Sequence, residues 1–456
     1  MHTPRPLDTD PTAEMGIEPI TVVDLFAGCG GFTQGFHEFR PGGAEDAGPI
    51  FQSIAAVEHN RAAAATYSVN FGPDREDGNP VKARVHVGDI EEWRPTSEDL
   101  HADVVVGGPP CQGFSALNRS KKGSERNRLW EEYVRIVAAI QPKVFVIENV
   151  DRFLKSDEFR DLLSEVKKGG QLENYRLVDP PGHLPGDTEE AKNKRYLLNS
   201  ADYGAVQARR RAIVIGVRRD IENRRIMTYP SRTHVPRPSR GTTSAAPLDG
   251  LNVGTAYWKA VDGVFDESSR LPLGEYPEGK KNYVSGVNGD VSGIFKTSDL
   301  HFGRAPKQLS VARYHAIPAG GNRKNLQNKW YTVDECGQFC FFDEPNPAGV
   351  RTPVHYLSTD SWDKHVTGTG DVMGRLRRGE PSVTIRTEFF KPEKGRYLHP
   401  DEPRPITHYE AARIQGFPVS FQWCGTKTEI AMQIGNAVPI PLGKAIASAI
   451  HAFLRG

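Results

Sequence analysis

Asp103-Val-Val-Val-Gly-Gly-Pro-Pro-Cys-Gln-Gly-Phe-Ser115 is the stretch of this 456-residue sequence that indicates both a fold and a chemistry. It opens with a short β-branched run bounded by turn residues, which is typical of a parallel strand buried on both faces. Two glycines then let the backbone turn, and two prolines stiffen it. The strand therefore delivers Cys111 into a loop, where its thiolate is a candidate nucleophile.

The segment after Cys111 favours a reactive thiolate over a structural cysteine. An isolated cysteine in a turn is more often a small core residue. Here, however, five basic side chains follow it against one acid, Glu125, and a positive field stabilises a thiolate. A basic loop with glycine and serine also suits a polyanionic substrate. The basic residues are Arg119, Lys121, Lys122, Arg126 and Arg128.

Three apolar runs near the start of the chain predict further strands. They cover residues 20–26, 53–58 and 83–90, and they end in a glycine turn, in Glu58 and in Asp89. A glycine turn after a first strand lets a ligand approach the backbone, and a strand-end acid can bind ribose hydroxyls. Because parallel strands end at one sheet edge, the three ends predict a nucleoside-shaped crevice.

A helix and another strand follow the basic loop. Apolar residues recur at helical spacing from Leu129 to Ile140, and residues 143–147 form a buried run that ends at Glu148. A right-handed crossover makes the strands before Cys111 and Glu148 parallel, so both side chains should lie at one sheet edge as candidate partners. Farther on, alternation should put Gln207, Arg209 and Arg211 on one face at the entrance of a strand over 212–217.

The composition changes after Val217. Residues 218–240 hold seven arginines and two acids among prolines, which indicates a basic linker that can contact phosphates. From about 241 to 400 the chain is rich in Gly, Pro, Asn and aromatic residues without a clear helical period, so we expect an irregular, mainly β domain. Cys336 and Cys340 lie in a run that we expect to form a hairpin turning at Asp334 to Gly337; a zinc site is the alternative, but no second Cys/His pair stands at suitable spacing.

Two helices are expected near the carboxyl terminus. Thr407 and Glu410 have the spacing of a capping box. A last helix carries Leu442, Ile446 and Ile450 on one apolar face, and we expect that face to cover the sheet of the first domain.

The overall composition fits a globular protein of a reducing compartment. The 58 basic and 57 acidic side chains nearly cancel, so any phosphate binding must come from local patches. Five cysteines without disulfide-like spacing indicate reducing surroundings, and we expect a cytoplasmic protein. No apolar stretch approaches the roughly 20 residues of a membrane span. Residues 1–18 lack an apolar signal core and are expected to be a disordered leader.

In order and spacing, these motifs resemble those of the cytosine-5 DNA methyltransferases. The match covers most of the chain outside about 241 to 370, and six motifs in the family order are not expected by chance. They are Asp24-Leu-Phe-Ala-Gly-Cys-Gly-Gly31 for the cofactor, Pro109-Pro-Cys-Gln112 for the nucleophile, Glu148-Asn-Val150 for the acid, Gln207-Ala-Arg-Arg-Arg211, and the closing pair around Glu410 to Pro418 and Gly435-Asn436.

The resemblance implies an α/β fold: a Rossmann-like S-adenosylmethionine-dependent methyltransferase sheet with a second, smaller, irregular, mainly β target-recognition domain. The last helix would return to the catalytic domain. The implied divisions are a leader (1–18), a catalytic cofactor-binding domain (19–228), a target-recognition domain (229–400), a hinge (401–430) and a C-terminal helix (431–456).

The implied reaction explains the residue types. Cytosine C5 is a weak nucleophile, so Cys111 would first add to C6, and the target base must be flipped out of the duplex. Glu148 would act at N3 as an acid whose pKa is raised by a desolvated site. Arg209 would hold the cytosine O2, with Arg211 supporting it.

The resemblance also implies the binding residues, with S-adenosylmethionine as cofactor and double-stranded DNA as partner, and without a metal. Expected cofactor contacts are Asp24, Phe26, Gly28, Gly30, Gly31, Glu58, Asp89, Ile90, Pro109 and Asn436. Expected DNA contacts are Gln112, Ser115, Arg119, Lys121, Lys122, Gln207 and Arg232.

Other activities explain the sequence less well. A nicotinamide oxidoreductase would not need Pro-Pro-Cys beside a basic loop, and an amino-group DNA methyltransferase needs no thiol. A non-catalytic DNA-binding protein would have no use for Cys111, Glu148 and a cofactor crevice together. A cytosine-5 transfer-RNA methyltransferase is the nearest alternative, although the large insert between Arg240 and about 370 favours DNA. We expect a monomeric prokaryotic modification enzyme, functionally paired with a restriction endonuclease.

Overall fold

The computed structural model describes residues 18–43, 49–76, 82–110, 128–221, 225–238, 256–277, 280–364 and 371–456. An eight-stranded sheet dominates the amino-terminal half, in the order β3-β2-β1-β4-β5-β8-β6, and β7 also pairs with β8. The expected α/β fold is confirmed. The strands are β1 (Ile20–Leu25), β2 (Phe51–Glu58), β3 (Arg84–Val87), β4 (Val104–Gly107), β5 (Val144–Asn149), β6 (Tyr175–Leu177), β7 (Leu197–Asn199) and β8 (Arg210–Arg218).

The register of the sheet aligns the ends of its parallel strands. Strands β1 to β5 are parallel, whereas β8 runs antiparallel to β5, β6 and β7. In the three central strands Leu25 pairs with Gly107, and Gly107 pairs with Ile147. The next residue of each strand therefore reaches the same edge. Since β8 enters the sheet where β5 leaves it, its first residues lie at that edge too.

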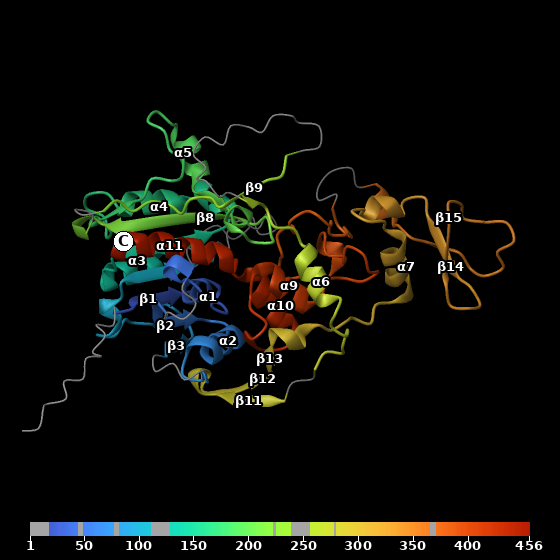
Figure 1. Cartoon of the computed structure of the whole chain (residues 1–456), viewed down its shortest axis with the longest axis horizontal. Helices are drawn as coiled ribbons and strands as arrows, with labels where there is room; N and C mark the ends of the chain where they lie inside the picture. Colours follow the sequence, from blue (N-terminus) through green and yellow to red (C-terminus); the bar gives the residue numbers. More distant parts are fainter. Residues whose placement is uncertain are drawn as a thin grey trace, which may run out of the picture.

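Helices cover the sheet and share one hydrophobic core with it. Tyr133 is buried there, and its hydroxyl donates to the Val146 carbonyl over 3.0 Å. Figure 1 shows α11 beside α1. The two helices can approach closely because Gly35 has no side chain; a Cβ there would lie 2.8 Å from the Ile440 carbonyl oxygen. The helices are α1 (Gly31–His37), α2 (Arg61–Phe71), α3 (Arg128–Ile140), α4 (Asp157–Glu165), α5 (Glu189–Arg195) and α11 (Ile440–Arg455).

The apolar face of α11 contributes to the core of the sheet. Leu442, Ile446 and Ile450 are fully buried in one cluster with the strand side chains. Thr407 and Glu410 form the expected capping box at the start of α9 (His408–Gln415). The carboxyl-terminal end of the chain thus packs against its amino-terminal half.

The remaining region combines short strands with helices. The expected hairpin is present, because β14 pairs with β15 across the turn from Asp334. Two helices that lack a clear period in the sequence, α6 and α7, also lie here. The elements are β9 (His234–Val235), β10 (Ala256–Tyr257), α6 (Asp262–Ser268), β11 (Lys281–Val284), β12 (Gly289–Ser292), β13 (Ile294–Lys296), α7 (Gln308–Ala316), β14 (Trp330–Val333), β15 (Phe339–Phe342), β16 (His355–Tyr356), α8 (Asp360–Asp363), β17 (Gln422–Cys424) and α10 (Lys427–Asn436).

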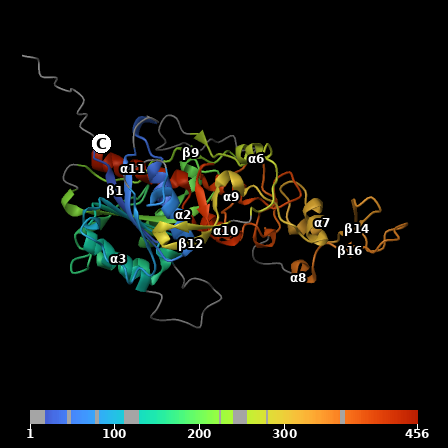
Figure 2. The same cartoon turned by 90° about the horizontal axis from the view of Figure 1, so that it is seen from below.

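The molecule is elongated. Figures 1 and 2 both place the sheet at one end, α9 and α10 in the middle, and α7 with β14 at the far end. Among the described helices no single one is long and apolar enough to cross a membrane; α10 and α11, bent by 42° where they meet, pass that test only as a pair, on length and composition. No cluster of metal-ligating side chains is found among the described residues.

Candidate active site

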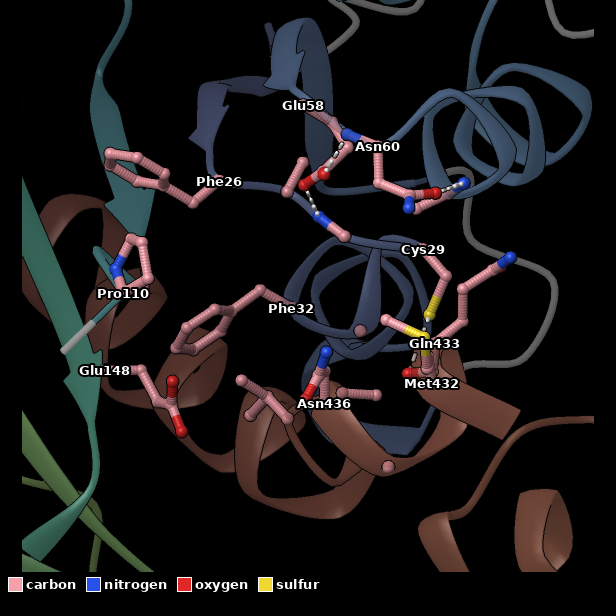
Figure 3. A pocket seen from close by; sticks show the side chains of 18 of the residues that line it. Phe26, Cys29, Phe32, Glu58, Asn60, Pro110, Glu148, Met432, Gln433 and Asn436 are labelled. Atoms are coloured by element: carbon pink, nitrogen blue, oxygen red, sulfur yellow. Dashed lines mark hydrogen bonds between the residues drawn. The ribbon is translucent and has the colours of Figure 1, made fainter. Parts of the chain in front are cut away.

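A cavity of about 1100 Å³ opens where the parallel strands end. Figure 3 shows strand-end side chains facing residues of α1 and α10 across it. It brings together most of the residues that the sequence selected. These are Asp24, Phe26, Gly28, Gly31, Glu58, Asp89, Ile90, Pro109, Glu148, Arg209, Arg211 and Asn436.

The glycine turn after β1 is fixed by the acid that ends β2. The Gly28 amide donates to Glu58 Oε2 over 2.8 Å, and the Asn60 amide donates to Oε1 over 2.7 Å. Phe26 has a φ of 54° and Gly28 a φ of 55°, so the turn leaves the strand abruptly. Burial raises the pKa of Glu58 above its ordinary value. Each Glu58 oxygen keeps accepting capacity that faces the cavity.

Gly30 serves the turn and does not line the cavity. It precedes α1 with a φ of 88°, a conformation that favours glycine. A Cβ there would lie 2.4 Å from the ring of Phe71 in α2. The expectation that Gly30 contacts a cofactor is therefore corrected, because its missing side chain makes room for α2.

Asp24 is a buried acid at the floor of the cavity. Its Oδ2 accepts a hydrogen bond of 2.8 Å from the Thr33 hydroxyl, and that hydroxyl also lies 2.9 Å from the Tyr67 hydroxyl. Burial raises the pKa of Asp24 to about 7. The group therefore exchanges a proton near neutral pH.

Glu148 and Arg211 form a pair on the opposite wall. Arg211 Nε lies 2.8 Å from Glu148 Oε1, and both side chains are nearly buried. A Cβ on Gly108 would lie 3.0 Å from Glu148 Oε2, so the bare backbone there gives the carboxylate room. The Asn149 side chain donates to the Pro109 carbonyl over 2.9 Å and holds the turn that leads to Pro110.

Pro110 lines the cavity, and Cys111 follows it directly in the chain. Cys111 itself lies outside the described residues. The same is true of five expected DNA contacts, namely Gln112, Ser115, Arg119, Lys121 and Lys122.

Arg209 has a different environment from the one expected. Its side chain is 2% exposed; Nη1 donates to the Ile385 carbonyl over 2.8 Å and Nη2 to the Gly435 carbonyl over 2.9 Å. Burial lowers its pKa to about 9. Both terminal nitrogens bind main-chain oxygens, so Arg209 holds two segments of backbone together; its buried Nε has no hydrogen-bond partner among the described residues, and the residue also lines the cavity.

Gln207 is also corrected, since it is fully buried and is no DNA contact. Its Oε1 accepts from the Ile385 amide over 2.7 Å, and its Nε2 donates to Gln415 over 2.8 Å. Arg232, in contrast, is exposed, and its Nε lies 3.3 Å from Asp202.

Sequence reasoning missed several residues of the cavity. The Gly435-Asn436 motif forms the end of α10 and could have led to the rest of that helix, which contributes Glu429, Met432 and Gln433. Nothing in the sequence pointed to Thr384, Arg386 and Thr387, which enter from the region assigned to DNA recognition.

Five parallel strands, an added antiparallel β8, a glycine turn after β1 and acids at the ends of β2 and β5 define the class of Rossmann-like methyltransferases. A crystal structure of a prophage-encoded protein from E. coli, described as a DNA modification methyltransferase, has this fold with a TM-score of 0.58. It is 19% identical and covers 96% of this chain and 100% of its own.

Residues 20–452 match the model of the C-5 cytosine-specific DNA methylase family. The chain belongs to this family and is a DNA cytosine-5 methyltransferase. It is 26% identical to the type II methyltransferase M.DdeI of Desulfomicrobium norvegicum, over 94% of this chain and 88% of the relative. It is 29% identical to the type II methyltransferase M.XorII of Xanthomonas oryzae, over 95% and 85%.

Proposed function

We propose that the protein transfers a methyl group from S-adenosylmethionine to C5 of a flipped-out cytosine in a specific duplex DNA sequence. The observation that carries this proposal is the strand register. It puts the glycine turn after β1, the Glu148–Arg211 pair and the turn before Cys111 around one cavity.

The cavity fits S-adenosylmethionine. The cofactor carries a ribose diol, an ammonium group and a sulfonium charge, and the wall offers the carboxylates of Asp24, Glu58 and Asp89. Gly28 and Gly31 expose main chain to it, which allows close approach of a ligand. When bound, S-adenosylmethionine supplies an electrophilic methyl group.

The residues of the chain activate the acceptor carbon. The Cys111 thiolate adds to C6 of cytosine, which makes C5 nucleophilic. Glu148 acts as a general acid that donates a proton to N3 and so neutralises the negative charge that develops on the ring. We assign the O2 contact to Arg211 in place of Arg209, because Arg211 lies against Glu148 and faces the cavity. After transfer, a base from the solvent takes the C5 proton, the C5–C6 double bond re-forms as the C6–S bond breaks, Cys111 leaves as the thiolate, and the N3 proton returns to Glu148.

The position of the cavity also supports base flipping. A cytosine stacked in a duplex hides C5 and C6, whereas these residues surround a concave site at the sheet edge. Unstacking costs a few kcal/mol, which contacts elsewhere on the DNA must offset.

The remaining parts of the proposal concern partners and context. We propose that residues 229–400 read the target sequence and that residues 401–430 connect this domain to the catalytic one at 19–228. Because relatives described as type II methyltransferases match over most of their length, we also propose a prokaryotic, cytoplasmic modification enzyme paired with a restriction endonuclease. We also propose that the protein is a monomer.

The test is transfer of labelled methyl from S-adenosylmethionine to duplex DNA and, separately, to transfer RNA, followed by bisulfite sequencing of the DNA. We expect label at cytosine C5 in one short sequence context. Cys111→Ala should abolish transfer while sparing DNA binding. Label confined to RNA would instead assign the chain the transfer-RNA activity, and full turnover by Cys111→Ala would remove the proposed nucleophile.

A further inference from the structure

A second cavity, of about 720 Å³, adjoins the active-site cavity. The two share three lining residues, Ala208, Thr384 and Arg386, which form a common rim. The second cavity extends from this rim between the 236–238 segment after β9 and the loop around Lys394. Any ligand that enters the active site past this rim must pass beside Arg386.

The wall of the second cavity has a surplus of positive charge. It contains two acids, and both are paired: Asp371 Oδ2 accepts from Arg396 Nε over 2.7 Å, and Glu380 lies 3.3 Å from Arg377. The guanidinium groups of Arg237 and Arg386, however, make no hydrogen bond or ion pair with any residue that the structure describes. The cavity therefore favours an anion.

Its other walls suit a ligand with apolar parts as well. Trp258 and Tyr397 line it together with Pro236 and Val383. The active-site cavity, in contrast, is lined by several acids, including Asp24, Glu58 and Asp89. The two cavities thus differ in charge although they meet at one rim.

The backbone that carries Arg386 is held on both sides. Its neighbour Ile385 is fixed through its amide by Gln207 and through its carbonyl by Arg209, over 2.7 and 2.8 Å. On the other side, a Cβ at Gly435 would lie 2.4 Å from the carbonyl carbon of Arg386. Arg386 is thus an exposed side chain on a rigid support.

We propose that the second cavity is a phosphodiester site and that Arg386 contacts a phosphate bonded to the flipped nucleotide. This inference rests on the proposed function. A cytosine held in the active site leaves its sugar and phosphates at the cavity mouth, where Arg386 stands. The strand then continues into the second cavity, and Arg237 meets a later phosphate. Arg386 is a positioning residue that holds the extruded nucleotide in place.

The first experiment measures the affinity for a duplex that contains the target site, by fluorescence anisotropy at several salt concentrations. One lost phosphate contact lowers the slope of log affinity against log salt by about 0.9. Arg386→Ala should show this decrease and bind about three- to tenfold more weakly. Arg386→Lys should restore the slope. Arg160→Ala is the matched control, because it removes an exposed charge from α4, outside both cavities.

The second experiment locates the phosphate. Single neutral methylphosphonates replace the phosphates around the target cytosine in turn. At one position flanking that cytosine, the methylphosphonate should weaken DNA binding by the wild-type protein but should not weaken binding by Arg386→Ala any further. Additive losses at every position, or an unchanged salt slope, would overturn the inference; so would relaxed sequence preference, which would make Arg386 a base reader. Failure of wild-type methyl transfer to DNA would instead refute the proposed function.

Discussion

Replacing Arg209 by methionine tests whether Arg209 holds the main chain in place or contacts the cytosine. The substitution keeps an unbranched, though shorter, side chain and removes the donors to the carbonyls of Ile385 and Gly435, 2.8 and 2.9 Å away. Two hydrogen bonds from a charged donor are worth about 3–6 kcal/mol together. Part of this is offset because burial, which lowers the Arg209 pKa to about 9, already penalises the charge. We therefore expect a loss of about 2–4 kcal/mol in the free energy of unfolding.

The assay is urea unfolding followed by tryptophan fluorescence, combined with calorimetric binding of S-adenosylmethionine. Arg210→Met is the control, since the exposed neighbour should change stability by no more than about 0.5 kcal/mol. Arg209→Lys should be intermediate, because it can keep one of the two bonds. Unaltered stability and cofactor binding in Arg209→Met, together with lost methyl transfer, would refute the role in holding the main chain and restore Arg209 as a cytosine contact.

Three further predictions concern Glu148, Asp24 and His408. Glu148→Gln should slow single-turnover transfer by about 10²–10⁴-fold with cofactor affinity nearly unchanged, and near-normal turnover would contradict its role. Burial raises the pKa of Asp24 to about 7, so the free energy of unfolding of the wild type falls as pH rises from about 4 to 7. Without cofactor, the unfolding free energy of Asp24→Asn relative to wild type should therefore increase by about 2 kcal/mol between pH 5.5 and 7. A difference that stays constant with pH would refute this. Burial lowers the pKa of His408 to about 4, so the stability that is present above pH 6.5 is lost as pH falls toward 4. In His408→Gln the melting temperature should depend less steeply on pH over this range. A dependence as steep as that of the wild type would exclude His408 as the cause.

The sequence predicted the sheet well because each parallel strand is a local signal. A short apolar run bounded by turn residues needs no distant partner to be recognised, and the right-handed crossover rule then fixes which strand ends share an edge. Glu58, Asp89 and Glu148 were found in this way, and all three line the cavity. The capping box at Thr407 was equally local.

The same reasoning failed where the hydrogen-bond partners of a side chain lie far away in the sequence. Gln207 and Arg209 stand in the expected motif, yet their partners come from positions 385, 415 and 435. Spacing within a motif carries no information about such contacts. Gly30 shows the same limit, because its requirement for glycine comes from the ring of Phe71 as well as from the turn.

These distant contacts give the Gln207–Arg211 motif two separate tasks. Gln207 and Arg209 are buried and hold the main chain of Ile385, whereas Arg211 pairs with Glu148 in the cavity. Backbone hydrogen bonds extend the junction, since the Ser382 amide donates to the Val206 carbonyl and the Ala208 amide donates to the Ser382 carbonyl, each over 2.8 Å. A segment from the region that we propose reads DNA, residues 229–400, is therefore built into the wall of the cavity. A shift of the 382–386 segment would therefore move Arg386 directly, and it would reach Arg211 and its partner Glu148 through the hydrogen bonds to the 206–209 segment.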